Sequence, residues 1–351
     1  MDQVTLTLDE VREVAAKALA AAGMSARNVE IMADLVTRAE RDDCHAHGLF
    51  RIPGYVTSMA SGRCNGAAEP AVEDAGPGLV KVDARDGFAP VAHAAGRPML
   101  VEKARSQGIA VMALVNNYNF NALWCDIEPL AEDGLVAIAC ANTRAFMAPW
   151  GGRTPLFGTN PFAFACPRRD KPPMVFDMAT AASARGEIMI AARDGHQVAE
   201  GLGVDKDGNP TTDPSAILEG AQLAFGGYKG AAIVLMVELL GAILTGGLNS
   251  TESFEQFAAY NDGGPSNAGE CVIAIDPGAF HGGDADRFLE RVEALFGAML
   301  ADGARLPGDR RHDARQDREG RDRHPEGALR PTDETGRRVI DCCGRPANVA
   351  E

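Results

Sequence analysis

The chain has 351 residues and a formal net charge of −15, which counts against a nucleic-acid partner because such partners normally meet a basic surface. Hydrophobic residues make up 46% of the chain and charged residues 24%, as in a globular protein with a buried core. No uninterrupted apolar run approaches the roughly 20 residues that a membrane span requires, so we expect no membrane partner.

The first residues and the cysteines predict a cytoplasmic protein. The beginning of the chain, MDQVTLTLDE, is acidic and lacks the basic start and apolar stretch of a secretory signal. The eight cysteines are scattered and form no Cys-x-x-Cys pair, which argues against a zinc site and against a disulfide framework. We therefore expect a reducing compartment and no metal.

The first 75 residues are predicted to be helical throughout. A first helix begins at Thr7 or Asp9, the two candidate N-caps, and a second begins at Ser25. A third follows Gly48, where apolar residues recur at helical spacing.

Strands and helices alternate through the middle of the chain. Apolar runs predict strands over 79–83, 109–115, 135–141, 162–166, 174–178 and 271–275. Helices are predicted over 89–107, 180–193, 231–244 and 284–301, and a polar loop over 195–214. This order indicates the α/β class without a regular βαβ array. No Gly-x-Gly-x-x-Gly follows a strand, so a dinucleotide would bind without the usual fingerprint.

The last forty or so residues have a different composition. From Arg310 onward there are ten arginines, few large apolar residues and no hydrophobic period, so a packed helix is hard to build there. We expect residues 313–351, and in particular the segment from Arg315 to Glu351, to form a mobile tail.

Two segments combine residues suited to binding an anion or moving a proton. In the segment 41–51, His47 lies one helical turn before Arg51, so the arginine could hold a carboxylate while the histidine transfers a proton. A polar helix cap with solvated histidines is the alternative. The segment 116–121 is rich in asparagines after an apolar strand, which suits a loop facing phosphate or nicotinamide but equally suits a polar turn.

Three further segments are rich in glycine or basic residues. The loop 151–161 would let backbone approach a ligand closely, although a structural loop is the alternative. At 225–230, Lys229 and the backbone N–H groups of a helix N-terminus could bind an anion. The cluster 305–311 could hold a nucleotide phosphate or be a solvated run of charge.

Taken together, five sequence segments resemble the malate/L-lactate dehydrogenase family, which is unrelated to the Rossmann-type lactate dehydrogenases. They are HGLFRIPGY from His47, PLFGTNPFAFACP from Pro155, VFDMATAASARGE from Val175, AFGGYKGAAIVLMVELL from Ala224 and RLPGDRR from Arg305. The likeness is greatest to the Δ1-piperideine-2-carboxylate/Δ1-pyrroline-2-carboxylate reductases of that family and runs in order over roughly residues 5–312.

The resemblance implies a non-Rossmann NAD(P)-binding domain with a mixed sheet, over approximately 76–280. An N-terminal helical part, 1–75, and a C-terminal part, 281–312, would pack together as a second, helical domain. The resemblance also implies a homodimer that binds a small imino or oxo acid.

The resemblance assigns roles to individual residues. His47 corresponds to the proton donor, Arg51 to the carboxylate-binding arginine and Thr159 to a substrate contact. The matching cofactor-binding residues are Asn119, Phe120, Asn121, Ala122, Leu123, Asp177, Met178, Ala179, Arg305, Leu306, Pro307, Gly308, Asp309, Arg310 and Arg311. Lys229 joins them as the candidate anion contact.

Four positions depart from the reductase pattern. The serine before the catalytic histidine is Ala46 here, and the relay aspartate is Glu187. The loop begins with Asn119 instead of histidine, and the small residue two places later is Asn121. We therefore hypothesise that His47, supported if at all by Glu187, acts alone, which favours imine over ketone substrates.

The expected function is NADPH-dependent reduction of cyclic 2-imino acids to pipecolate- or proline-type products, with NAD as a second candidate cofactor. One alternative is an NAD(P)-dependent 2-hydroxy-acid dehydrogenase of the malate or lactate type. A second alternative is a cofactor-binding protein whose catalytic site has decayed. The same motifs fit all three functions, so substrate profiles are needed to distinguish the functions from one another.

Overall fold

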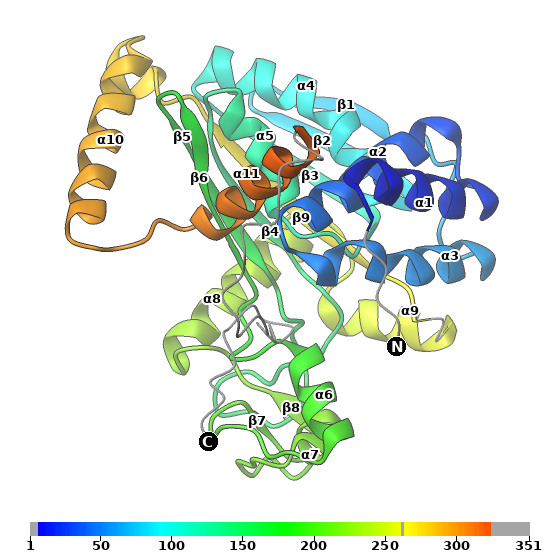
Figure 1. Cartoon of the computed structure of the whole chain (residues 1–351). Coiled ribbons are helices and arrows are strands. Elements are labelled where there is room, and N and C mark those ends of the chain that lie inside the picture. The colour runs from blue at the N-terminus through cyan, green and yellow to red at the C-terminus, as the bar shows by residue number, and fades with distance from the viewer. Residues whose placement is uncertain (1–5, 261–262, 324–351) are drawn as a thin grey trace.

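A seven-stranded sheet forms the centre of the protein in the computed structural model, which describes residues 6–260 and 263–323 (Figure 1). Its strand order is β1-β2-β3-β9-β4-β5-β6. The strands are β1 (Ala71–Gly76), β2 (Leu79–Phe88), β3 (Ile109–Asn119), β4 (Val136–Ala141), β5 (Phe162–Arg168), β6 (Lys171–Met178) and β9 (Ser266–Ile275). Strands β2 and β3 pair in parallel and the other neighbours pair antiparallel. The predicted α/β class with a mixed sheet is confirmed.

Strand β9 lies between β3 and β4, although it comes more than a hundred residues after them in the chain. Val272 pairs with Met112 on one side and with Ala139 on the other, and all three side chains are buried. The sequence predicted this strand only from Cys271, but it begins at Ser266. Its polar first half pairs with the asparagine-rich end of β3, where Asn267 lies opposite Tyr118.

Helices α4 (Ala89–Gln107) and α5 (Trp124–Glu132) pack on the sheet, α4 on β2 and β3 and α5 on β4, β5 and β6. Helix α2 (Ala26–Arg41) packs on α4, and α1 (Leu8–Ala21) packs on α2. Thr7 is the N-cap of α1: its hydroxyl accepts a hydrogen bond from the Glu10 backbone N–H at 3.2 Å, and the Glu10 carboxylate accepts from the Thr7 backbone N–H at 2.8 Å. The expectation of helix throughout residues 1–75 is wrong at its end, because β1 begins at Ala71.

A smaller lobe lies below the sheet in Figure 1 and contains α6 (Arg185–Asp194), β7 (Gly203–Val204), α7 (Pro214–Glu219) and β8 (Ala221–Gln222). The predicted helix 180–193 begins only at Arg185, because Ala181 pairs with Ala224 in an isolated β-bridge. The predicted loop 195–214 contains the short strand β7. The apolar helix begins at Tyr228 as α8 (Tyr228–Glu238) and continues as the π-helix η3 (Leu239–Ile243), and α9 (Ser250–Tyr260) follows.

The two C-terminal helices pack on different parts of the protein. Helix α10 (Ala285–Ala301) lies along β5 (Figure 1), and its Glu293 forms ion pairs with Arg168 at the end of β5 and Lys171 at the beginning of β6. The expected packing of 281–312 on the N-terminal helices is therefore not seen for α10. It is α11 (Asp309–Arg323) that contacts α2.

The predicted mobile tail is wrong for residues 313–323, which belong to α11. Arg315 of this helix donates to the carboxylates of Asp42, at 2.6 Å, and Glu128, at 3.1 Å, and both carboxylates are buried. The helix is therefore attached by charge pairing, which hydrophobic periodicity cannot reveal. The remainder of the predicted tail, 324–351, lies outside the described residues. None of the helices in the described part of the chain combines the length and apolarity needed to cross a bilayer.

Candidate active site

His47 and Arg51 lie on two short 3₁₀ turns, η1 (His45–His47) and η2 (Leu49–Arg51), which connect α2 to α3 (Ile52–Ala60). Glu40 at the end of α2 holds both turns: its carboxylate accepts from the Leu49 backbone N–H at 2.8 Å and contacts the His45 ring. These contacts of Glu40 hold η1 and η2 in place and thereby fix the directions of the His47 and Arg51 side chains.

His47 is present mainly as the neutral imidazole. Its Nδ1 lies 2.8 Å from the carbonyl oxygen of Phe120, and because a carbonyl oxygen can only accept, Nδ1 carries the proton. Burial, together with the positive charge of Arg51, lowers the pKa of His47 to about 4. Near neutral pH its Nε2 is therefore a hydrogen-bond acceptor, and the alternative of a solvated histidine does not describe His47, although it does describe the exposed His45.

Arg51 presents a positive charge without a carboxylate partner among the described residues. Its guanidinium lies over the ring of Phe120, 4.7 Å from the centroid, and its Nε is buried without a hydrogen-bond partner in the described structure. Burial lowers the pKa of the guanidinium. A half-buried guanidinium with an unsatisfied Nε is well suited to binding an anionic group such as a substrate carboxylate.

Phe120 links His47 and Arg51 through its backbone and its ring. A glycine on α3, Gly54, makes room for that ring: a Cβ at this position would lie 2.6 Å from Phe120 Cε2. Tyr55 packs against the other part of the ring, with centroids 5.8 Å apart. The position of the ring therefore depends on a close approach that only glycine permits.

The loop 119–123 is held by its own asparagines and by the first turn of α5. Asn119 Oδ1 accepts from the Asn121 backbone N–H at 2.8 Å, and Asn121 Nδ2 donates to Asp126 at 2.5 Å. Asn121 Oδ1 is buried and has no partner among the described residues. The last two residues of the loop, Ala122 and Leu123, are buried.

Asp177, at the end of β6, connects the sheet to the N-terminus of α5. Its carboxylate accepts from the Trp124 backbone N–H at 3.0 Å, where the positive end of the helix dipole favours an anion. Burial nevertheless raises the pKa of Asp177 to about 6, and Arg311 opposes this shift. The next two residues, Met178 and Ala179, are exposed.

The basic segment 305–311 packs beside the same strand end. Arg311 donates to the Val175 carbonyl at 2.7 Å and lies over the Trp124 ring, 5.1 Å from its centroid, while its Nε is buried without a partner in the described structure. Gly308 has a φ of +94°, and a Cβ there would lie 3.0 Å from the Val175 carbonyl oxygen. Leu306 is buried, whereas Arg305, Pro307 and Arg310 are exposed. Asp309 accepts from the Leu306 backbone N–H at 2.9 Å, at the beginning of α11.

Three segments that are far apart in the sequence thus meet around Trp124: 119–123, 175–179 and 305–311. Trp124 itself was missed by the sequence analysis, although its backbone holds Asp177 and its ring holds Arg311. The available signal was its rarity, since the chain has only two tryptophans and this one directly follows the asparagine-rich loop.

Thr159 lies in a separate group of hydrogen bonds. Its backbone N–H donates to Thr143 Oγ1 at 3.0 Å, and its carbonyl accepts from the Thr180 backbone and hydroxyl at 2.8 and 2.9 Å. The neighbouring Asn160 donates to the buried carboxylate of Glu238 on α8 at 2.7 Å. Among the described residues, no hydrogen bond joins Thr159 to His47 or Arg51.

Two further candidate residues, Glu187 and Lys229, have no hydrogen bond or ion pair with His47 or Arg51 in the described structure. Glu187 on α6 accepts from the Ser183 hydroxyl at 2.6 Å, and no hydrogen bond or ion pair in the described structure joins it to His47. Its expected support of His47 is therefore not seen as a direct contact, and its role in the reaction stays a prediction. Lys229 is exposed in the first turn of α8, with its Nζ 6.0 Å from the ring centroid of Tyr228.

The chain was compared with known protein families, sequences and structures. Residues 6–322 match the malate/L-lactate dehydrogenase family. The chain is 48% identical over 315 residues to a Δ1-pyrroline-2-carboxylate/Δ1-piperideine-2-carboxylate reductase of Pseudomonas aeruginosa, covering 89% of this chain and 93% of that protein. Its identity to the protein of the same name from Pseudomonas putida is 49% over 296 residues, covering 84% and 85%.

A solved structure is similar over the same extent. The crystal structure of Δ1-piperideine-2-carboxylate reductase from Pseudomonas syringae pv. tomato matches with a TM-score of 0.85 and 44% identity, covering 90% of this chain and 94% of that chain. The resemblance found in the sequence is thereby confirmed. This chain belongs to the malate/L-lactate dehydrogenase family of oxidoreductases.

Proposed function

We propose that the protein catalyses the NADPH-dependent reduction of cyclic 2-imino acids, namely Δ1-pyrroline-2-carboxylate and Δ1-piperideine-2-carboxylate. The observation that carries this proposal is the half-buried Arg51, with its buried and unpartnered Nε, next to a neutral His47. The relatives named for these two substrates, at 48% and 49% identity, support the substrate class.

Arg51 would bind the substrate carboxylate. The guanidinium presents several N–H donors in one plane, which matches the two oxygens of a carboxylate. Phe120 supports the guanidinium from one face, so the carboxylate can approach only from the remaining directions. The C2 atom of the substrate, one bond from the carboxylate, is thereby held in a fixed orientation.

His47 would accept a hydrogen bond from the substrate nitrogen. A protonated cyclic imine carries an N–H, and the unprotonated Nε2 of His47 can accept from it. The reduced nicotinamide supplies the hydride that adds to C2, and the C=N π electrons move to nitrogen, giving a secondary amine. A ketone would instead need a proton from the enzyme, which an imidazole with a pKa of about 4 provides poorly.

NADPH fits the residues grouped around Trp124. Three buried polar atoms there, Arg311 Nε, Asn121 Oδ1 and Trp124 Nε1, have no hydrogen-bond partner among the described residues, as expected for groups that meet a ligand. We infer that Asn121 faces the nicotinamide and that Arg305, Arg310 and Arg311 bind the nucleotide phosphates. The three positive charges favour NADPH over NADH because only NADPH carries a 2′-phosphate.

A homodimer and a cytoplasmic location are also part of this proposal. Large apolar side chains lie exposed on neighbouring turns of α8 and η3, namely Leu235, Met236, Leu239, Ile243 and Leu244. An exposed apolar stripe of this kind is typical of an interface. Light scattering after size-exclusion chromatography tests the dimer, and a mass of one chain at micromolar concentration would contradict it.

The activity is tested by the loss of nicotinamide absorbance with purified protein. Δ1-Pyrroline-2-carboxylate, Δ1-piperideine-2-carboxylate, pyruvate and oxaloacetate are compared, each with NADPH and with NADH. We expect fast turnover of the two cyclic imines with NADPH. Turnover of only the oxo acids would assign the protein to the dehydrogenase branch, and no turnover would indicate a decayed site.

A further inference from the structure

A buried cluster of one histidine and two carboxylates lies on the helix-covered face of the sheet, outside the residues used so far. His93 comes from α4, Asp126 from α5 and Glu270 from β9. His93 Nε2 lies 3.0 Å from Glu270 Oε1 and 3.9 Å from Asp126 Oδ2, and the three donor atoms all lie within 4.8 Å of one another. Side-chain exposure is 8% for His93, 3% for Asp126 and 0% for Glu270.

The hydrogen-bonding capacity of the cluster is largely unused. Both carboxylate oxygens of Glu270 and the Nε2 of His93 are buried without a hydrogen bond of good geometry to any described residue. Asp126 accepts one hydrogen bond, from Asn121 Nδ2. Buried carboxylates are normally satisfied by donors or by a cation. Glu270 Oε1 has only the His93 ring nitrogen at 3.0 Å, and Oε2 has no hydrogen-bond partner among the described residues.

We propose that His93, Asp126 and Glu270 bind one divalent transition-metal ion, of the zinc or manganese type. Imidazole nitrogen and carboxylate oxygen are the ligands that these ions prefer. Donors that share one such ion at about 2.0–2.2 Å lie roughly 3 to 3.5 Å apart. The 3.0 Å between His93 Nε2 and Glu270 Oε1 already meets this geometry, and Asp126 Oδ2, at 3.9 Å from His93 Nε2, would have to move closer.

Charge also favours a divalent cation at this place. The carboxylates of Asp126 and Glu270 lie together in the protein interior, and a divalent ion bound between them would compensate their negative charge. Two arginines, Arg38 and Arg97, line the adjoining cavity, and Arg38 is paired with Glu128 at 3.2 Å.

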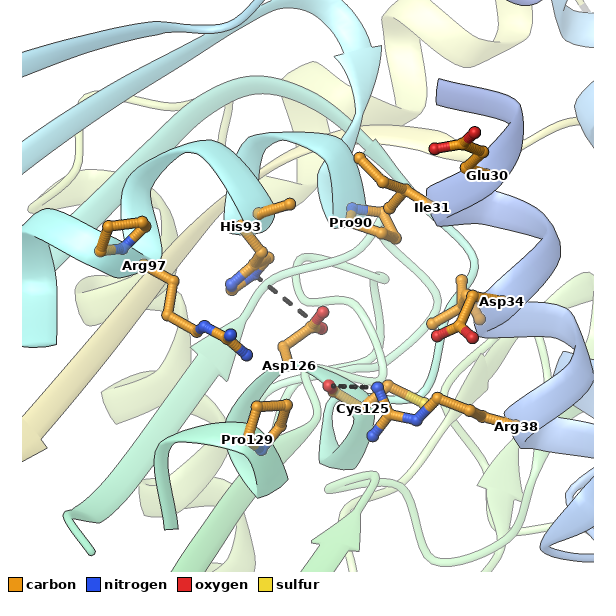
Figure 2. Close-up of a pocket in the computed structure, with 13 residues that line it drawn as sticks. Glu30, Ile31, Asp34, Arg38, Pro90, His93, Arg97, Cys125, Asp126 and Pro129 are labelled. Atoms are coloured by element: carbon orange, nitrogen blue, oxygen red, sulfur yellow. Dashed lines mark hydrogen bonds and ion pairs between the residues drawn. The ribbon is translucent and has the colours of Figure 1, made fainter. Parts of the chain in front are cut away.

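The cluster can be reached from solvent. His93 and Asp126 line a cavity of about 380 Å³ between α2, α4 and α5, and Figure 2 shows the two side chains pointing toward one another in it. Glu30 and Asp34 of α2 lie on the opposite side of this cavity (Figure 2). The cavity wall thus carries two carboxylates, Glu30 and Asp34, as well as Arg38 and Arg97.

The metal would act on the loop beside the proposed nicotinamide site. Asp126 is both a proposed ligand and the acceptor for Asn121. A metal ion that fixes Asp126 therefore also fixes Asn121, so the site stabilises the structure and does not take part in the reaction. This ion is distinct from the proposed cofactor, and metal binding can be measured without any turnover.

The test is metal binding by the full-length protein after removal of metals with a chelator. We expect one Zn²⁺ or Mn²⁺ per chain in a competition titration, and Co²⁺ as a probe should give visible absorption bands. Glu270→Gln keeps the shape of the side chain and should weaken binding at least tenfold. The matched control is Glu30→Gln, which removes a carboxylate from the cavity wall and should leave the affinity within twofold.

Two results would overturn the proposal. One is the absence of stoichiometric binding of Zn²⁺, Mn²⁺ and Co²⁺ by the wild-type protein at millimolar metal. The other is equal affinity in wild type and Glu270→Gln, which would assign binding to surface histidines. Thermal unfolding confirms that each variant is folded, and Asp126→Asn replaces Glu270→Gln if the latter does not fold.

Discussion

The carbonyl oxygen of Phe120 lies 2.8 Å from Nδ1 of His47, and this contact determines which form of the imidazole meets a substrate. It places the proton on Nδ1 and leaves Nε2 as the acceptor. The ring of the same phenylalanine lies against Arg51. One residue of the asparagine-rich loop therefore controls both the proposed proton-handling group and the proposed carboxylate-binding group.

Arg51→Lys is expected to lower kcat/KM for the cyclic imines roughly 30- to 1,000-fold, since a fully desolvated charge pair contributes about 2 to 4 kcal/mol. A lysine retains the charge but not the planar fork that binds two carboxylate oxygens. Steady-state kinetics give the value. A change of less than threefold would show that the substrate carboxylate binds elsewhere.

Gly54→Ala is expected to lower kcat/KM without unfolding the protein. The new Cβ would lie 2.6 Å from Phe120 Cε2, so the ring must move and displace its contacts with His47 and Arg51. Gly297→Ala on α10 is the matched control, because nothing lies within 4 Å of its Cβ. Both substitutions favour helix by about 1 kcal/mol, so equal activity of the two variants would contradict the role of Phe120.

The pH dependence of kcat/KM should show no ionisation of His47 between pH 5 and pH 8, because its pKa is about 4. His47→Ala removes the acceptor and should lower kcat/KM about 10- to 100-fold at every pH in this range. An acidic limb near pH 6.5 that disappears in His47→Ala would contradict the neutral imidazole. Ala46→Ser restores the hydroxyl of the relatives and should keep or raise activity, so a loss of activity would count against His47 acting alone.

Arg310→Ala is expected to reduce the preference for NADPH over NADH roughly 10- to 150-fold, because a hydrogen bond to a charged group contributes about 1.5 to 3 kcal/mol. Arg310 is the better choice for this test, because Arg311 also binds the Val175 carbonyl and packs on Trp124. The ratio of the two kcat/KM values measures the preference. An unchanged ratio would place the 2′-phosphate away from this segment.

Arg315→Ala is expected to lower the free energy of unfolding by about 2 to 4 kcal/mol, since it leaves the buried Asp42 and Glu128 without their shared partner. Arg38 and Arg41 still contact these carboxylates, which limits the loss. Chemical denaturation gives the value. A change below 0.5 kcal/mol, about the size of an exposed ion pair, would show that α11 does not depend on this contact.

The same ion pairs predict how stability depends on acid. Burial raises the pKa of Glu128, but hydrogen bonds from His312 and the charges of Arg315 and Arg38 prevail and lower it to about 2. A carboxyl group with a lowered pKa stabilises the fold above its unfolded pKa, so its contribution is lost as the pH falls from roughly 4.3 to 2. Arg315→Ala should weaken this dependence, which denaturation at several pH values measures.

Local sequence patterns predicted most of the sheet and its covering helices because those elements bury apolar side chains at regular spacing. The beginning of β9 was missed because Ser266 and Asn267 are polar and are buried only by pairing with β3. Helix α11 was missed because charge pairing by Arg315 attaches it, and no hydrophobic period records that contact.

The sequence also indicated part of the candidate site. The pair His47 and Arg51 was found from its spacing, and the resemblance added the loop and the basic segment that meet at Trp124. The cluster of His93, Asp126 and Glu270 gave no signal, because its members come from three elements far apart in the chain. Only the folded sheet brings these three residues together. The absence of a Cys-x-x-Cys pair from the sequence therefore says nothing about this cluster.

The central claim is that the protein transfers hydride from NADPH to C2 of a cyclic imino acid. The most direct test uses NADPH deuterated at C4 of the nicotinamide, on one face and then on the other, with Δ1-pyrroline-2-carboxylate as substrate. Mass spectrometry of the product should find one deuterium at C2 of proline with one of the two labels and none with the other. Proline without deuterium from both labels, or no proline at all, would contradict the claim.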